Sequence, residues 1–282
     1  MSELKFKRFT INQRIQHIIF FMSFILLAYT GFPLKFPDEW WSRWMIDSVG
    51  GFDNRTLIHH ISGFMMIGVS IYHVVYHGIL EKPNYDILFN LNDIKDFKQQ
   101  ILYNLKIIDD HPKFGRYTWK QKFEYFGGGF GAVIMGFTGM LMLNPFESMK
   151  YFPIGFIQIA NLFHTWEAVL ASIAIFIGHF YDEHFEKFLN LSWLTGNISE
   201  EEMKHEHPLE YEAVMDDYKS NNIVNNIDIN KSNKLESNNI MKRSTVIISK
   251  TIFTFIFLTI GIWMLWISYN ILVEAFKTYI YY

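Results

Sequence analysis

The chain has 282 residues, of which 50% are hydrophobic and 18% are aromatic, and its formal net charge is −3. The absence of cysteine excludes c-type haem attachment, thiolate-ligated iron–sulfur clusters, disulfides and a thiol nucleophile within this chain. The charge is nearly neutral, and no sequence feature suggests nucleic-acid binding. Because the apolar residues occur in long blocks, the composition predicts an all-α membrane protein.

Five apolar segments are long enough to cross a hydrocarbon core of about 30 Å, which needs about 20 helical residues. We expect them at Ile15–Leu34, Thr56–Leu80, Lys122–Leu143, Ile157–Tyr181 and Ile248–Leu272. Basic residues precede the first segment, but its apolar run is too long for a signal peptide and has no small-residue cleavage site. The first segment is therefore predicted to be retained as a transmembrane helix.

The loops between these segments differ in charge. Lysine and arginine are concentrated in the amino terminus and in residues 81–122, whereas the turn at 144–156 has only Lys150 against Glu147. The positive-inside rule then predicts that the amino terminus and residues 81–122 are cytoplasmic. The loops 35–55 and 144–156 are predicted to lie outside.

Composition divides the chain into three predicted parts. Residues 1–190 contain the first four spans, which we expect to form a four-helix bundle. Residues 191–247 are acidic and then polar, and such a stretch buries too little apolar surface to fold alone, so it is predicted to be a flexible cytoplasmic linker. Residues 248–282 are expected to add a C-terminal transmembrane helix.

Two histidines lie fifteen positions apart in the fourth span. On an α-helix this spacing places them roughly 22 Å apart along the axis and about 60° apart around it. The predicted topology gives each of them two candidate partners of matching depth: outer His164 with His59 or His60, and inner His179 with His17 or His73. Histidines in hydrocarbon are costly and mark functional sites. We therefore expect two bis-histidine haem sites, which suit electron transfer.

A weak internal repeat bears on these alternatives. Thr30-Gly31 in the first span and Thr138-Gly139 in the third each precede a span with a histidine near its start. The repeat predicts two helix pairs, and it favours His73 over His17 because that pairing uses the second and fourth spans only. The third span is also rich in glycine, which allows close helix packing and equally makes room for a flat porphyrin.

At this point the sequence resembles the cytochrome b (gamma) subunits of respiratory formate dehydrogenases and the related b-type subunits of thiosulfate reductases and nickel-iron hydrogenases. The resemblance covers about residues 8–190. It is carried by Gln13-Arg14-Ile-Gln-His17, Tyr29-Thr30-Gly31-Phe-Pro33, Arg55-Thr-Leu-Ile-His59-His60-Ile-Ser-Gly63, Gln121-Lys122-Phe-Glu-Tyr125, Thr138-Gly139, His164 and His179-Phe-Tyr181.

The resemblance implies an electron-transfer subunit with two haem b groups in a bacterial cytoplasmic membrane. It implies that His17 and His179 bind the cytoplasmic-side haem, and that His59 and His164 bind the outer haem. It also implies electron transfer from a periplasmic iron–sulfur partner to menaquinone. Because the polar stretch and the fifth span extend beyond the family's four-helix pattern, a multihaem c-type cytochrome is an alternative partner.

The family's quinone-site stretch, of the form Tyr-Asn-x-Gly-Gln-Lys, falls on residues 117–122. The resemblance thus implies a quinone site that includes Tyr117, Thr118, Lys120 and Gln121. The family's asparagine and glycine are replaced by Thr118 and Lys120 in this chain.

An alternative hypothesis from another class is a membrane di-iron oxygenase of the desaturase or hydroxylase type. Such enzymes bind iron through short histidine boxes, which this chain offers as His73-x-x-x-His77, His179-x-x-x-x-His184 and His205-x-His207. The full set of boxes is missing, and this hypothesis leaves His59 and His164 unexplained. Non-haem iron without a haem spectrum would favour it.

Overall fold

The computed structural model describes residues 5–81, 85–186 and 191–224, with the side chains of 181–186 and 220–224 outside the description. Two compact units divide these residues. We call residues 8–81 and 126–196 the bundle unit, and residues 5–7, 85–125 and 197–224 the polar unit. The predicted fifth span, Ile248–Leu272, and residues 225–247 of the predicted linker lie outside the described residues.

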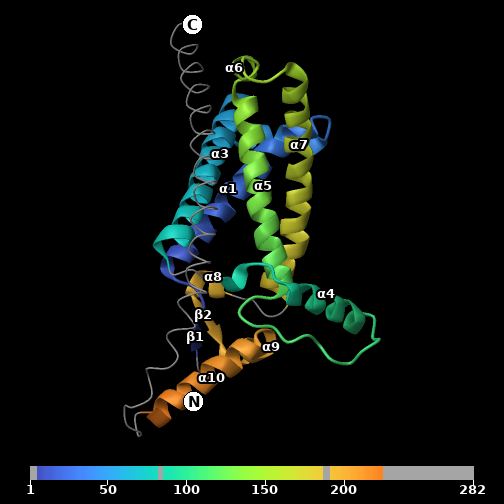
Figure 1. The fold of residues 1–282 in the computed structure, drawn as a ribbon. Coiled ribbons are helices and arrows are strands. Elements are labelled where there is room, and N and C mark those ends of the chain that lie inside the picture. Colours follow the sequence, from blue (N-terminus) through green and yellow to red (C-terminus); the bar gives the residue numbers. More distant parts are fainter. Residues whose placement is uncertain (1–4, 82–84, 187–190, 225–282) are drawn as a thin grey trace. The chain divides into compact units, whose positions relative to one another are not determined.

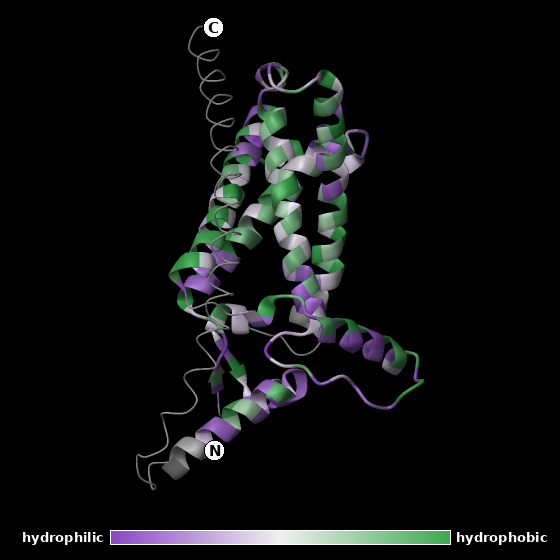
Figure 2. Ribbon diagram, in the orientation of Figure 1, coloured by the Kyte–Doolittle hydropathy of each residue, from purple (hydrophilic) through white to green (hydrophobic). Residues whose placement is uncertain are grey.

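Four of the predicted spans are confirmed as long helices that run lengthwise past one another (Figure 1). Within the described residues these candidate membrane spans are Ile11–Lys35, Phe52–Leu80, Trp119–Leu143 and Ile154–Phe180. Only 6–22% of the residues in their apolar windows are buried within the chain. The remaining apolar side chains need lipid or a partner around them. Figure 2 shows hydrophobic residues in green along the long helices.

Local signals in the sequence determine where these helices begin. Helix α1 (Ile11–Lys35) starts with a capping box, in which Thr10 and Gln13 exchange side-chain to backbone hydrogen bonds of 2.9 and 3.3 Å. Helix α3 (Phe52–Val75) follows Gly51, whose φ of 97° favours glycine. Helix α5 (Trp119–Leu143) follows the Thr118 cap, and α7 (Ile154–Ile173) follows Pro153.

Small residues allow α1 and α3 to pack closely in the bundle unit. Ser23 and Thr30 of α1 and Ser62 of α3 are almost completely buried, which is typical of helix contacts in a membrane. A separate apolar cluster of Leu141, Ile157 and Ala160 joins α5 to α7. The shorter helices of this unit are α2 (Trp40–Ser48), α6 (Pro145–Ser148) and α8 (Ser192–Thr195).

Two of the spans end in π-helix rather than α-helix. The π-helical segments are η1 (Tyr76–Leu80), which continues α3, and η3 (Ala174–Glu186), which continues α7. The expectation of continuous α-helix from His164 to His179 is therefore wrong for the last turns. A π-helix bonds residue i to i+5 and has more residues per turn, so the angle of about 60° between the two histidines does not apply.

The polar unit contains a short two-stranded antiparallel sheet. Strand β1 (Lys5–Lys7) pairs with β2 (Asn197–Ser199), with Phe6 opposite Ile198. The other elements are α4 (Leu91–Asn104), α9 (Glu200–Glu206), α10 (Pro208–Val224) and the 3₁₀ turn η2 (Tyr85–Ile87). Figure 2 shows hydrophilic residues on α4 and α10.

The structure differs from the expected flexible linker over residues 191–224. Helix α9 is capped by Ser199, whose hydroxyl accepts a 3.2 Å hydrogen bond from the Glu202 backbone N–H. Ile198 and Met203 are buried, and the Leu209 N–H donates to the Phe114 carbonyl at 3.1 Å. The average composition conceals these apolar positions, which find partners elsewhere in the chain. The predicted domain limits stay a prediction.

Candidate functional site

His59 of α3 and His164 of α7 face each other in the bundle unit. Their ring centroids are 6.4 Å apart, with an interplanar angle of 64°. An imidazole nitrogen binds a metal at about 2 Å, so two rings that share one iron have centroids roughly 6 Å apart. The separation fits one haem iron between the rings. We call this the outer pair, after the membrane face that the loop charges predict for it.

A threonine from the neighbouring helix holds His59. The Thr30 hydroxyl donates to the Leu26 carbonyl at 2.6 Å and lies 2.9 Å from the Nδ1 of His59. A hydroxyl has one proton, which Thr30 gives to the carbonyl, so it accepts a hydrogen bond from the Nδ1–H. This tautomer leaves Nε2 with its lone pair, the form of imidazole that binds a metal.

The same arrangement occurs in the second helix pair. The Thr138 hydroxyl donates to the Ile134 carbonyl at 2.7 Å and lies 2.9 Å from the Nδ1 of His164. A Cβ atom on Gly31 would lie 3.3 Å from the Cε1 of His59, and one on Gly139 would lie 3.2 Å from the Cε1 of His164. Each threonine therefore orients a histidine while the glycine after it provides room for the ring.

This contact distinguishes the two histidines that open the second span. His59 donates to the Thr30 hydroxyl and faces His164. His60 is the next residue on α3 and therefore points about 100° away around the helix axis. The Thr-Gly repeat thus places His59 in the outer pair.

His17 of α1 and His179 of η3 form a second pair, which we call the inner pair. Their ring centroids are 6.0 Å apart and the rings are inclined by 49°, so this separation also fits one iron. Trp193 of α8 packs on His17 with ring centroids 5.6 Å apart. The inner pair therefore combines one α-helix with a π-helical segment, and π-helices are frequent at functional sites.

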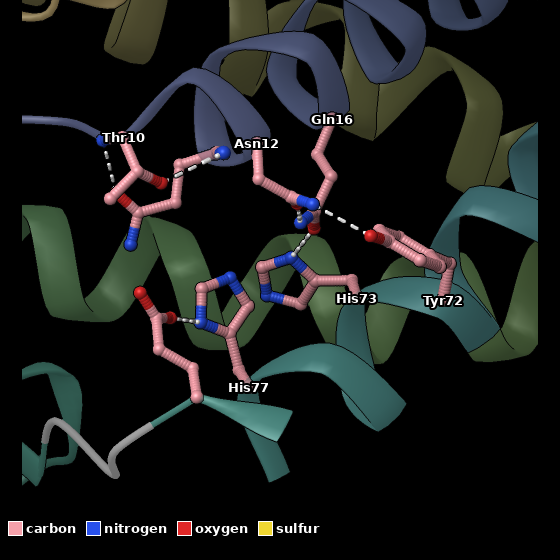
Figure 3. Close-up of polar contacts among 8 residues, drawn as sticks. Thr10, Asn12, Gln16, Tyr72, His73 and His77 are labelled. Carbon is pink, nitrogen blue, oxygen red and sulfur yellow. Dashed lines mark hydrogen bonds and ion pairs between the residues drawn. The ribbon is translucent and has the colours of Figure 1, made fainter. Parts of the chain in front are cut away.

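His73 belongs to a neighbouring polar cluster (Figure 3). Its Nδ1–H donates to the Oε1 of Gln16 at 2.7 Å. The Gln16 amide donates to Asn12, whose Nδ2 donates to the Tyr72 hydroxyl at 2.6 Å. His73 also packs on His77, with ring centroids 4.5 Å apart. His73 thus contacts this cluster and also packs on Phe20, with ring centroids 5.9 Å apart, while His179 packs on His17.

His77 and Glu81 continue this cluster at the end of the π-helical segment η1. The Nδ1 of His77 lies 2.6 Å from a Glu81 carboxylate oxygen. Both side chains are about three-quarters buried. This contact gives His77 a carboxylate partner within the cluster.

The expected quinone stretch begins α5 in the polar unit. The Thr118 N–H donates to the Gln121 side chain at 3.2 Å, and the Gln121 N–H donates to the Thr118 hydroxyl at 3.1 Å. This reciprocal pair is a capping box. Lys120 lies 3.9 Å from Glu124, and the Arg116 guanidinium lies 5.8 Å from the centre of the Tyr117 ring. The polar groups of Thr118 and Gln121 are therefore used to start the helix.

Charged side chains hold α4 and the start of α5 together beside this stretch. Lys122 pairs with Asp93 at 2.8 Å, and both side chains are less than 10% exposed. Burial, together with the charge of Asp93, raises the pKa of the Asp96 carboxyl. Arg116 binds Glu210 at 2.6 Å. Although burial disfavours a charged guanidinium, Tyr117 and Glu210 outweigh it and raise the pKa of Arg116.

Two histidines of the boxes in the di-iron hypothesis contact protein groups in the polar unit. His207 contacts the Gly115 carbonyl at 2.8 Å through Nδ1, and His205 pairs with Glu206. The His184 side chain lies outside the description. Among the described residues, no group of three or more His, Cys, Asp or Glu side chains could hold a metal ion.

The sequence did not reveal the hydrogen-bond partners of the ligands. Thr30 and Thr138 belong to the short Thr-Gly repeat, which by itself predicted no role for them in orienting a histidine. The signal that identifies them is a Thr-Gly pair on one helix followed by a histidine on the next, present twice in the chain. Gln16 was also missed, and only its burial inside an apolar span reveals it.

Comparison with known proteins shows the family to which the chain belongs. A family of prokaryotic cytochromes b561 matches residues 8–192, which contain both histidine pairs. The formate dehydrogenase cytochrome b556(fdo) subunit of Escherichia coli (strain K12) is 25% identical over 210 residues, or 73% of this chain and 92% of the relative. The same subunit from Escherichia coli O157:H7 matches with the same values.

The match covers well over half of the chain and includes all four membrane spans of the described residues. The chain therefore belongs to the prokaryotic cytochrome b561 family and is a multi-pass bacterial membrane cytochrome b that transfers electrons with haem b.

Proposed function

We propose that the chain binds two haem b groups, the outer one through His59 and His164 and the inner one through His17 and His179. The observation that carries this proposal is that both pairs have ring separations suited to one iron, 6.4 and 6.0 Å. Haem b supplies one-electron chemistry when bound. Two histidines on one iron leave no open coordination position, which suits electron transfer rather than oxygen chemistry.

We infer that the two pairs lie at different depths in the membrane. His59 lies in the second turn of α3 and His17 in the second turn of α1, and these helices cross the membrane in opposite directions on the predicted topology. His164 and His179 lie on one span that joins the two depths. The two sites would thus carry electrons between the two membrane faces.

We further propose that the electrons pass between a periplasmic redox partner and the quinone pool. The relatives are named as subunits of formate dehydrogenase, which supports a catalytic partner, either an iron–sulfur subunit or a multihaem c-type cytochrome. The loop charges support a cytoplasmic amino terminus and hence an inner haem near the cytoplasmic face. Menaquinone is the acceptor that the family resemblance supports.

The residues proposed to bind the quinone come from the family resemblance. The proposal of Tyr117, Thr118, Lys120 and Gln121 stays a prediction. Thr118 and Gln121 form the capping box of α5, in which the acceptor oxygen of each side chain binds a backbone N–H. Replacing either one is expected to affect the start of the helix as well as any quinone.

The test uses the full chain purified from haem-replete cells. A pyridine haemochrome assay is expected to give two haems b per chain, with low-spin reduced-minus-oxidised bands. His164→Ala and His179→Ala should each remove one haem, and the double variant should remove both. His205→Ala is the matched control, because His205 is exposed on α9. A colourless preparation, or full haem content in the double variant, would refute the proposal.

A further inference from the structure

Arg55 is a buried cation beside the outer pair. It lies in the first turn of α3, four residues before His59, and is only 5% exposed. Residues four apart lie on the same face of an α-helix. A charge in such a place is costly unless another charge or several hydrogen bonds compensate for it.

The described hydrogen bonds of Arg55 use two of its five N–H donors. One terminal nitrogen donates to the Thr30 carbonyl at 2.9 Å, and the other donates to the Thr56 hydroxyl at 2.8 Å. The guanidinium also lies 5.1 Å from the centre of the Phe52 ring. Its Nε is buried and has no hydrogen-bond partner. Within the described part of the chain, Arg55 has no ion pair with a carboxylate.

Thr30 connects this cation to the outer pair. Its carbonyl accepts from Arg55, and its hydroxyl contacts the Nδ1 of His59. The equivalent position in the second helix pair, four residues before His164, is Ala160, which is buried in the apolar cluster. The two halves of the repeat therefore differ, because only the half that contains His59 has a cation, Arg55. This difference indicates an anionic group beside Arg55.

We propose that Arg55 binds a carboxylate of the haem that the outer pair holds. This inference rests on the proposed function. Haem b carries two propionate carboxylates, and guanidinium binds carboxylate strongly in a planar, charge-assisted geometry. An anionic lipid headgroup would offer similar chemistry, but the burial of Arg55 favours a group that enters with the cofactor. The positive charge also favours the reduced form of this haem.

The first test measures midpoint potentials by spectroelectrochemical titration of the full chain in the His179→Ala background, where only the outer haem is expected. Arg55→Gln should lower the midpoint potential of the outer haem by at least about 59 mV, which is a tenfold change in the equilibrium constant for one-electron reduction. Arg55→Lys should retain part of the effect because it keeps the charge. Arg43→Gln is the matched control, since Arg43 is exposed and pairs with Asp47. An unchanged potential in Arg55→Gln would overturn the inference.

The second test separates carboxylate binding from a purely structural role. Apoprotein is loaded with haem or with haem dimethyl ester, whose carboxylates are blocked. The unsubstituted chain should take up free haem at least tenfold better, and Arg55→Gln should lose this preference. Equal uptake of both forms by the unsubstituted chain would overturn the inference, even if Arg55→Gln fails to assemble.

Varying the lipid composition distinguishes a haem carboxylate from a lipid headgroup, and the haem content distinguishes failure of this inference from failure of the proposed function. Nanodiscs with and without anionic lipid should give the same potential, and a potential that changes only with anionic lipid would assign Arg55 to a headgroup instead. If the His179→Ala chain contains no haem at all, the proposed function fails. If haem is present but insensitive to Arg55 and to esterification, only this inference fails.

Discussion

The outer and inner pairs have similar ring separations but are built differently. Each outer histidine lies on an α-helix and is oriented by a threonine hydroxyl from the neighbouring helix, at 2.9 Å in both cases. The inner pair joins an α-helix to the π-helical segment η3 and packs against Trp193 of α8. One local motif, used twice, therefore builds the outer pair, whereas the inner pair depends on contacts that occur once.

The difference between the two pairs arises from the contacts of His73, the inner histidine of α3. A strictly repeated bundle would have used His73 opposite His179. Gln16 instead accepts a 2.7 Å hydrogen bond from His73, and the His77 ring packs on the His73 ring. The place opposite His179 is taken by His17, one residue after Gln16. The repeat thus governs one end of the bundle and not the other.

The largest effects are expected from replacing the competing inner histidines. His17→Ala should lose one of two haems, because His17 is the ring that packs on His179. His73→Ala should retain both haems, since His73 hydrogen-bonds Gln16 while the rings proposed to hold the inner haem are those of His17 and His179. The pyridine haemochrome assay on purified full-length protein measures both. Loss of a haem in His73→Ala together with full content in His17→Ala would establish the pairing that the repeat favours.

The histidine doublet of α3 provides the same comparison at the outer end. His59→Ala should remove the outer haem, because it deletes the imidazole that Thr30 orients. His60→Ala should keep both haems and serves as the neighbouring control. Haem content and the low-spin spectrum distinguish the two variants. Equal haem content in both variants would contradict the role given to the Thr-Gly motif.

The sequence predicted what depends on periodicity and apolar length. The first span was expected at Ile15–Leu34 and is found at Ile11–Lys35, because 20 apolar residues at helical rise match the bilayer. The predicted membrane depths also matched His164 with the His59 and His60 doublet. Both results need only helix geometry and loop charge.

The sequence did not predict what depends on tertiary contacts. Hydropathy does not distinguish α-helix from π-helix, so η3 around His179 was missed. No sequence pattern encodes the hydrogen bond from His73 to Gln16 or the packing of His17 on His179. The order in residues 191–224 depends on single apolar side chains such as Ile198 and Met203. Average composition cannot reveal such contacts.

Intermediate effects are expected from the two threonines. Replacing Thr30 or Thr138 with valine keeps the shape but removes the acceptor for the imidazole N–H. Loss of such a partner typically costs about 10 to 100-fold in metal affinity. Transfer of haem to apomyoglobin should accelerate to that extent for the outer haem only. Threonine to serine variants should restore retention, because serine keeps the hydroxyl.

The two valine variants also test whether the repeated half-sites are equivalent. Because both hydroxyl to imidazole distances are 2.9 Å, Thr30→Val and Thr138→Val should have similar effects on haem retention. Retention as in the unsubstituted chain would show that the hydrogen bonds do not hold the ligands. Acceleration of inner-haem loss instead would indicate general loosening of the bundle.

The smallest effects are expected from the glycines beside the outer rings. An alanine Cβ at Gly31 or Gly139 would lie 3.3 or 3.2 Å from a histidine ring carbon, so the ring must move by a few tenths of an ångström. The same change favours the helix by about 1 kcal/mol, so haem retention should fall a few-fold while thermal stability does not. Gly128→Ala is the control, because a Cβ there has no neighbour within 4 Å. Gly128→Ala should gain helix stability while its rate of haem transfer is unchanged. Equal rates of haem transfer in Gly128→Ala and Gly139→Ala would show that the His164 ring has free space. The outer site would then be looser than its threonine contacts indicate.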